Sequence, residues 1–298
     1  MTFGKTTFQY LVFGDLHGRV LPAFALARRY QDDFGVVLAG LLQVGDLGYF
    51  PDPSRLDSAS RRHAAKDPLE LVVSEFHAGN QLAARFFERF DPLLKLYFTV
   101  GNHEDYELLQ RWRRPDEAMW PVDDFQRLWC LDDGCVAQLP TGLRVASLWG
   151  IDGVAPKARR IRVPRVQIDS TAVQRLCDGP PFDVLLCHES PRDAIWIDSG
   201  SLEISQIIER QQPDVACFGH YHTPGRLAEC HFGKTRVNWM SGLELQHRTG
   251  VAEPHSVGLL SQSTTGCEFE YLPEEWLAEF TRANWQNWLR PSPGRQDA

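Results

Sequence analysis

The sequence lacks the features of a secreted or membrane-bound protein. Its seven cysteines include no C-x-x-C pair, and their odd number argues against a disulfide framework and for a reducing compartment. Residues 1–10 lack the charged start and apolar stretch of a signal peptide, and no apolar run approaches the length that spans a membrane. We therefore expect a cytoplasmic protein with no membrane association.

Positive charge is scarce. The 298 residues include 31 Lys and Arg against 39 Asp and Glu, so the net charge is -8. Phosphate backbones are bound by a local excess of Lys and Arg, so this balance disfavours general nucleic-acid binding but still permits a local basic patch. Hydrophobic residues make up 43% of the chain, which is enough for a sizeable core in one large domain or two small ones.

Five short apolar runs predict buried strands. They cover residues 8–13, 36–44, 93–100, 184–187 and 215–218. Their apolarity is continuous rather than alternating, which is typical of strands covered on both faces. Two further runs at 135–139 and 143–148 flank a Pro-Thr-Gly turn and predict a hairpin, and residues 236–240 and 258–260 are candidates for later strands.

Helical spacing of apolar residues predicts the connections between strands. The predicted helices cover residues 19–30, 69–90, 202–210 and 274–289. Alternating strands and helices indicate an α/β or α+β layered domain. We expect one main domain over residues 1–272, and a C-terminal helix and tail over 273–298 that docks through aromatic side chains.

Each of the five apolar runs ends in a residue type that binds metals. These residues, in chain order, are Asp15 and His17, Asp46, Asn102, His188, and His220 and His222. Glycine directly precedes the first such residue in four of the five cases and lets the backbone turn sharply. Because ligands of layered α/β sheets bind at the carboxyl ends of strands, we expect these side chains to converge.

The predicted ligand set indicates the kind of metal. Two carboxylates, one amide oxygen and four imidazoles suit manganese, iron, zinc or nickel better than magnesium or calcium. Seven ligands exceed one tetrahedral site but fit two ions that share a carboxylate, as in sites for in-line displacement at phosphorus. Each motif alone would be an ordinary turn, but their succession at five strand ends favours a metal site. We expect two divalent metal ions, with manganese as first choice.

Five blocks of sequence carry these residues, namely Gly14-Asp15-Leu16-His17-Gly18, Gly45-Asp46, Gly101-Asn102-His103-Glu104, Cys187-His188-Glu189 and Gly219-His220-Tyr221-His222. In type and order they resemble the blocks of the calcineurin-like metallophosphoesterases over residues 14–222. The resemblance implies an α/β fold, a four-layer α/β/β/α sandwich with two mixed β-sheets. It also implies a dinuclear metal-dependent hydrolase in which a metal-bridging hydroxide attacks the phosphorus.

The resemblance also implies roles for single residues. The implied ligands are Asp15, His17 and His222 for one ion, Asn102, His188 and His220 for the other, and Asp46 for both. His103 is expected to contact the phosphate and to protonate the leaving oxygen as a general acid. The nearby carboxylates Glu104, Asp105 and Glu189 either orient an imidazole ligand or are ordinary solvated side chains.

Two further comparisons concern the substrate. Phosphoprotein phosphatases of this family carry Asp-Arg a few residues after the bridging Asp, whereas residues 47–51 here read Leu-Gly-Tyr-Phe-Pro and supply no phosphate-clamping Arg. A weaker resemblance to the RNA lariat debranching enzymes, through residues 101–104, 143–151 and 183–191, favours a phosphodiester, although those enzymes usually carry Cys in place of Asp15. We expect a nucleotide or nucleic-acid phosphodiester as substrate. The alternatives are a phosphomonoesterase or phosphoprotein phosphatase, and a non-catalytic metal-binding scaffold.

A basic stretch is a further candidate for substrate binding. Residues 157–165 hold five basic side chains between the predicted hairpin and the fourth strand. Arg159 and Arg160 in this stretch could grip a second phosphate or a nucleic-acid backbone. The alternative is a solvated loop whose charges offset acidic neighbours.

Overall fold

The structure contains two β-sheets. It is a computed structural model that describes residues 7–76, 79–89, 94–114, 116–152, 166–222, 229–245 and 250–289. The first sheet consists of β1 (Phe8–Phe13), β2 (Gly40–Gln43), β3 (Leu96–Phe98), β4 (Met119–Pro121), β5 (Leu128–Leu131), β12 (Val257–Ser263) and β13 (Gly266–Tyr271). The second consists of β6 (Cys135–Gln138), β7 (Arg144–Leu148), β8 (Val184–Cys187), β9 (Val215–Phe218), β10 (Glu229–Phe232) and β11 (Thr235–Trp239).

Helices connect and cover the strands. The described α-helices are α1 (Val20–Phe34), α2 (Ser58–Ala64), α3 (Gln81–Arg89), α4 (Tyr106–Trp112), α5 (Ser170–Asp178), α6 (Leu202–Gln211) and α7 (Glu274–Ala278). The described 3-10 helices are η1 (Pro53–Arg55), η2 (Pro68–Phe76) and η3 (Trp285–Leu289). No helix within these ranges is both long and apolar enough to cross a lipid bilayer.

Both sheets are mixed. The first has the order β13-β12-β1-β2-β3-β5-β4, with parallel pairing from β1 to β5 and antiparallel pairing at both edges. The second has the order β10-β11-β9-β8-β7-β6, parallel from β11 to β7 and antiparallel at its edges. Because the central strands are parallel, the carboxyl ends of β1, β2 and β3 lie at one edge of the first sheet, and those of β8 and β9 at one edge of the second.

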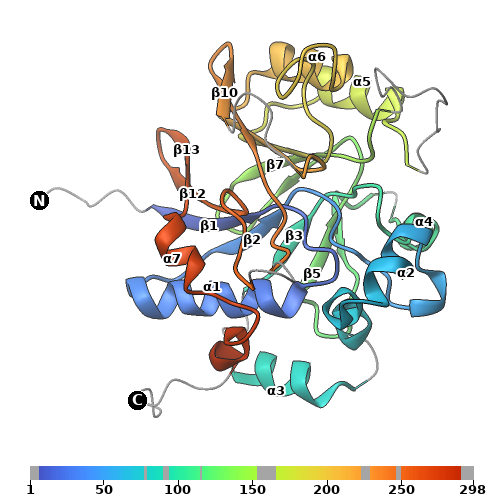
Figure 1. Cartoon of the computed structure of the whole chain (residues 1–298). Helices are drawn as coiled ribbons and strands as arrows, with labels where there is room; N and C mark the ends of the chain where they lie inside the picture. Colours follow the sequence, from blue (N-terminus) through green and yellow to red (C-terminus); the bar gives the residue numbers. More distant parts are fainter. Residues whose placement is uncertain are drawn as a thin grey trace, which may run out of the picture.

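The two sheets pack face to face between two layers of helices (Figure 1). In β1, Val12 belongs to the apolar layer between the sheets, whereas Phe13 belongs to the cluster that contains α1. In β8, Leu186 belongs to the same inner layer, whereas Leu185 packs in the cluster that contains α5 and α6. Successive strand residues point to opposite faces, so the order of layers is helix, sheet, sheet, helix. The predicted four-layer sandwich with two mixed sheets is confirmed.

Two predicted helices are interrupted. The segment predicted as one helix over 69–90 forms η2 and α3, and Gly79 lies between them with φ 74°, a left-handed conformation that does not continue a helix. The segment predicted as one helix over 274–289 forms α7 and η3. Here Thr281 leaves the helical path because its backbone pairs with Val251 in an isolated antiparallel bridge.

Candidate metal centre

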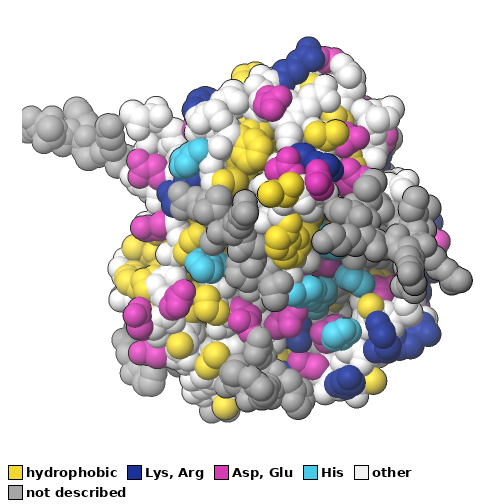
Figure 2. All heavy atoms as spheres, turned by 45° about the horizontal axis from the view of Figure 1, so that its top comes forward, with side chains coloured by type: hydrophobic (Ala, Val, Ile, Leu, Met, Phe, Trp, Pro, Cys, Tyr) yellow, Lys and Arg dark blue, Asp and Glu magenta, His cyan; other side chains and the backbone are white. Residues whose placement is uncertain are grey.

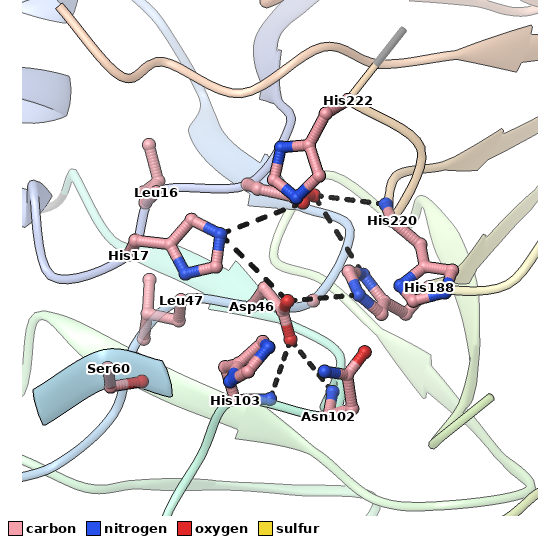
Figure 3. A network of polar contacts seen from close by, with 12 residues as sticks. Leu16, His17, Asp46, Leu47, Ser60, Asn102, His103, His188, His220 and His222 are labelled. Atoms are coloured by element: carbon pink, nitrogen blue, oxygen red, sulfur yellow. Dashed lines mark hydrogen bonds and ion pairs between the residues drawn. The ribbon is translucent and has the colours of Figure 1, made fainter. Parts of the chain in front are cut away.

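The strand ends of the two sheets meet at one place. Asp15, Asp46 and Asn102 follow the parallel neighbours β1, β2 and β3. His188 and His220 follow β8 and β9, which are parallel neighbours in the other sheet. Figure 3 shows how the side chains from these loops surround Asp46. The structure therefore brings together the residues that the strand-end pattern singled out.

Asp46 lies at the centre of the group. Its Oδ2 is 3.2 Å from Nε2 of His188 and 4.0 Å from Nε2 of His17. Its Oδ1 accepts hydrogen bonds from the backbone amides of Asn102 and His103 at 2.7 and 2.8 Å. Two amide donors thus fix the carboxylate, while its second oxygen faces one histidine from each sheet.

Among the described residues, two groups of side chains have the spacing of a metal site. In each group the ligand atoms lie within 4.8 Å of one another, and the groups are Asp15, His17 and His222, and Asp15, Asp46 and His188. Asp15 therefore belongs to both groups, with Oδ2 3.9 Å from Nε2 of His17 and Oδ1 3.9 Å from Nδ1 of His188. His220 lies outside both groups but close by, with its ring centroid 5.1 Å from that of His188.

Two buried ligand atoms have no hydrogen-bond partner within the described residues. They are Oδ1 of Asn102 and Nε2 of His188, although the latter forms an ion pair with Oδ2 of Asp46 at 3.2 Å. Nδ1 of His188 lies 3.2 Å from the carbonyl oxygen of Val44, so loss of the Nε2 proton would leave the tautomer that offers Nε2 to a metal. An unpaired buried polar atom costs about 1–3 kcal/mol. Because both atoms are metal-ligand types, the residues fit a divalent cation bound here.

Burial shifts the pKa values of the predicted ligands. It raises the pKa of Asp15 to about 7 and lowers the pKa of His17 to about 4 and that of His220 to about 3. Neutral imidazole is the form that binds metals. Burial alone would also lower the pKa of His188, but the carboxylates of Asp46 and Asp15 raise it to about 10. The negative charge that retains this proton would equally attract a metal cation.

The backbone approaches the ligands very closely. A Cβ at Gly101 would lie 2.2 Å from Oδ1 of Asp46, and a Cβ at Gly219 would lie 2.2 Å from Oδ1 of Asp15. Asp46 itself has φ 53° and His17 has φ 42°, a left-handed conformation that is strained for residues other than glycine. The glycines that precede the ligands are therefore required for space, and not only for turning.

One side of the centre opens to solvent. The His188 side chain is 0% exposed, whereas that of His222 is 65% exposed. A cavity of about 80 Å³ adjoins the open side, lined by His17, Ala59, Ser60, His63, Glu70, His103, His222 and Glu244. Figure 2 shows histidines gathered among acidic side chains on one face of the molecule. A substrate can therefore reach the histidines from one direction.

His103 is oriented by a carboxylate that the sequence patterns did not single out. Its Nδ1 lies 2.8 Å from Oδ2 of Asp57. Asp57 also caps α2, because it accepts hydrogen bonds from the amides of Ala59 and Ser60 at 2.7 and 2.9 Å. Burial alone would lower the pKa of His103, but the hydrogen bond to Asp57 and the charge of Asp46 raise it to about 9. The hydrogen bond to Asp57 therefore favours the protonated imidazole.

The candidate orienting carboxylates have other roles. Glu104 accepts a hydrogen bond from the amide of Leu47 at 2.7 Å and so holds the loop after Asp46. Oδ1 of Asp105 accepts a hydrogen bond from Nη2 of Arg55 at 2.8 Å.

Glu189 accepts hydrogen bonds from the amide of Ser190 at 2.8 Å and from the hydroxyl of Tyr221. Glu244 also faces the imidazole of a predicted ligand, with its Oε1 3.4 Å from Nδ1 of His222. Glu244 lies outside the five sequence blocks that carry the predicted ligands. Arg159 and Arg160 lie outside the described residues.

Comparisons with known proteins agree with this geometry. The family described as calcineurin-like phosphoesterase matches residues 8–224. One solved structure is 15% identical, with 90% of this chain and 100% of that chain covered and a TM-score of 0.50, which concerns the fold alone. No curated protein is a significant match.

Two further solved structures are less similar in fold. A conserved uncharacterized protein from Streptococcus pneumoniae, described as a predicted phosphoesterase, is 10% identical over 91% of this chain and 92% of that one, with a TM-score of 0.35. Vacuolar protein sorting 29 from Cryptosporidium parvum is 11% identical over 89% and 97%, with a TM-score of 0.35. The family match, by contrast, spans most of the chain and every strand end described above. The protein therefore belongs to the calcineurin-like phosphoesterases, which are metal-dependent hydrolases of phosphate esters.

Proposed function

We propose that the protein hydrolyses phosphodiesters of nucleotide or nucleic-acid type at a dinuclear metal centre. The observation that carries the proposal is the buried Oδ1 of Asn102, which has no hydrogen-bond partner among the described residues, at the centre where Nε2 of His188 meets the carboxylate of Asp46. Two divalent ions bound there would supply an activated water and would stabilise negative charge on the phosphate. Manganese is the first choice, and iron, zinc or nickel are alternatives, because the donors are carboxylate, amide and imidazole groups.

The geometry supports part of the proposed division of ligands between the two ions. We assign Asp15, His17 and His222 to one ion, Asn102, His188 and His220 to the other, and Asp46 to both. The first assignment is supported because these three side chains form one of the two close groups. The shared role of Asp46 is supported because its Oδ2 faces histidines of both sets, at 3.2 and 4.0 Å.

We assign the general acid to His103. Its Nδ1 is held by Asp57, so Nε2 is the nitrogen that can donate a proton to a leaving oxygen. The ring lies beside that of His17, with centroids 5.6 Å apart, and both rings line the cavity. Asp57 contributes by holding the imidazole in one orientation and by raising its pKa.

The charge of the cavity favours a diester over a monoester. A monoester carries a second negative charge near neutral pH, which needs extra cations to bind. The cavity is lined by Glu70 and Glu244, and no Lys or Arg of the described residues lines it. The segment after Asp46 also supplies no Arg. These features disfavour a doubly charged phosphate and leave the singly charged diester as the better substrate.

A cytoplasmic location completes the proposal. All seven cysteines are free thiols in the structure, which supports a reducing compartment. Fractionation of the source cells checks this point, and recovery of the protein outside the cytoplasm would contradict it.

A hydrolysis assay tests the proposed activity. Manganese-loaded protein is given bis-p-nitrophenyl phosphate and p-nitrophenyl phosphate at the same pH, and kcat/KM is compared. We expect the diester to have the higher value. A clear preference for the monoester would contradict the substrate assignment, and no turnover of either ester by fully metallated protein would contradict the catalytic role.

A further inference from the structure

Arg19 holds the loop that carries His17. Its side chain is 5% exposed, and its Nη1 lies 3.4 and 3.3 Å from the backbone carbonyl oxygens of Leu16 and His17. His17 has a left-handed backbone at φ 42°, and this conformation raises the free energy of the loop because His17 is not glycine. Because a buried guanidinium has little water to compete for its donors, these contacts restrain the strained loop.

Two carboxylates fix the position of Arg19. Its Nη2 lies 2.8 Å from Oδ2 of Asp67 and 3.3 Å from Oε1 of Glu70, both at the start of η2. A buried cation is tolerated only when it is paired, so Arg19 depends on these partners. The backbone of η2 also packs closely against the loop, because a Cβ at Gly18 would lie 2.3 Å from the carbonyl oxygen of Glu70.

Asp67 is in turn held by the C-terminal segment. Arg282, between α7 and η3, places Nη2 2.6 Å from Oδ1 and Nη1 2.7 Å from Oδ2 of Asp67, a two-pronged pairing. The backbone amide of Arg282 is anchored to the carbonyl of Gly250 at 2.7 Å. The other face of the segment packs on the body of the protein, since η3 contacts α1. A continuous chain of contacts therefore runs from Arg282 to the His17 loop.

We propose that the C-terminal segment is part of the metal centre's support, and that Arg282, Asp67 and Arg19 are positioning residues for His17. Arg282 lies beyond residues 8–224, which the family match covers, so the family match does not itself imply this support. Loss of Arg282 leaves Asp67 with one arginine, loosens Arg19 and lets the His17 loop relax. Metal affinity then falls, whereas the chemistry at saturating metal is retained. The inference rests on the proposed metal site.

Manganese titration of metal-stripped protein tests the inference. In Arg282→Gln we expect the dissociation constant for manganese to rise about tenfold, the size usual for residues that orient metal ligands. Excess manganese should restore kcat, because no catalytic group is removed. Arg282→Lys keeps the charge but not the two-pronged contact, and should fall between Arg282→Gln and wild type.

Arg29→Gln is the matched control. Arg29 is also buried and also anchors the C-terminal segment, through the carbonyl oxygen of Trp276 at 2.9 Å and the carboxylate of Glu279, but these contacts do not lead to the His17 loop. The Arg29→Gln variant should have a lower unfolding temperature and an unchanged affinity for manganese. If Arg282→Gln behaves the same way, the segment only stabilises the fold and the inference is wrong. Wild-type protein that binds no manganese would instead contradict the proposed function, and the inference with it.

Discussion

Asn102 and His103 are neighbours in the chain but face different partners. Oδ1 of Asn102 is buried without a hydrogen-bond partner in the described structure, whereas Nδ1 of His103 is bonded to Asp57. One residue therefore offers a lone pair to a cation, and the other keeps a proton. Substitution of His103 should for this reason separate turnover from metal binding.

We expect His103→Ala to keep its metal ions and to lose most of its activity. Removal of a general acid lowers kcat by about 10²–10⁴-fold. Elemental analysis gives the metal content, and steady-state assays with the diester give kcat. A parallel loss of metal would show that His103 is a ligand, and the division between ligand and acid would then be incorrect.

Asp133 should make the stability of the protein depend on pH. It is buried and accepts a hydrogen bond from the amide of Trp149 at 2.9 Å, and burial raises its pKa to about 7. An unfolded Asp has a pKa of about 4, so the folded protein binds more protons between pH 4 and 7. This contribution to stability is present at low pH and is lost as the pH rises to about 7.

Asp133→Asn tests that dependence, because the amide oxygen can still accept the Trp149 hydrogen bond but cannot ionise. Relative to wild type, the variant should gain about 1–4 kcal/mol of unfolding free energy between pH 5 and pH 8. Denaturant unfolding at both pH values, with manganese present, measures the difference. An equal difference at the two pH values would mean that Asp133 does not titrate as described.

The sequence predicted the candidate ligands better than their surroundings. Asp15, Asp46 and His188 were indicated because each follows a continuous apolar run. Asp57 and Glu244 follow no such run, and they reach His103 and the centre only through the packing of separate loops. Their contacts depend on tertiary structure, which no local pattern contains.

At the scale of elements, continuous apolar runs were the reliable signal. The strands β1, β8 and β9 have the predicted boundaries, because each is buried between two layers. Strands β4 and β5 were not predicted, and β4 is an edge strand of only three residues. β13 was also missed, since this edge strand has the mixed sequence Gly-Cys-Glu-Phe-Glu-Tyr. The helices predicted across 79–80 and 279–284 are interrupted there, because the spacing of apolar residues does not reveal a local change of backbone conformation.

The exit of β3 should not tolerate a side chain at Gly101. A Cβ there would lie 2.2 Å from Oδ1 of Asp46, so Gly101→Ala must displace the carboxylate. We expect metal content and turnover to fall together. Gly35→Ala is the control, because no atom lies within 4 Å of its Cβ and its left-handed φ of 64° should cost only about 1 kcal/mol. Full metal content in Gly101→Ala would contradict the described packing.

At the scale of the whole molecule, the candidate centre lies where the two sheets meet. The first sheet supplies Asp15, Asp46 and Asn102, and the second supplies His188 and His220. The distances between these side chains therefore depend on how the sheets pack through their inner apolar layer. The sandwich could be predicted from the family resemblance, whereas the chain of contacts from Arg282 to the His17 loop could not.

The number of metal ions per chain tests the central claim most directly. Wild-type protein and Asp46→Asn are purified in manganese, freed of excess metal, and analysed for metal and protein in the same sample. We predict two ions per chain in the wild type and loss of metal from both sites in Asp46→Asn, because this carboxylate faces histidines of both sets. A fully active wild type with one ion per chain, or Asp46→Asn with two, would contradict the dinuclear centre.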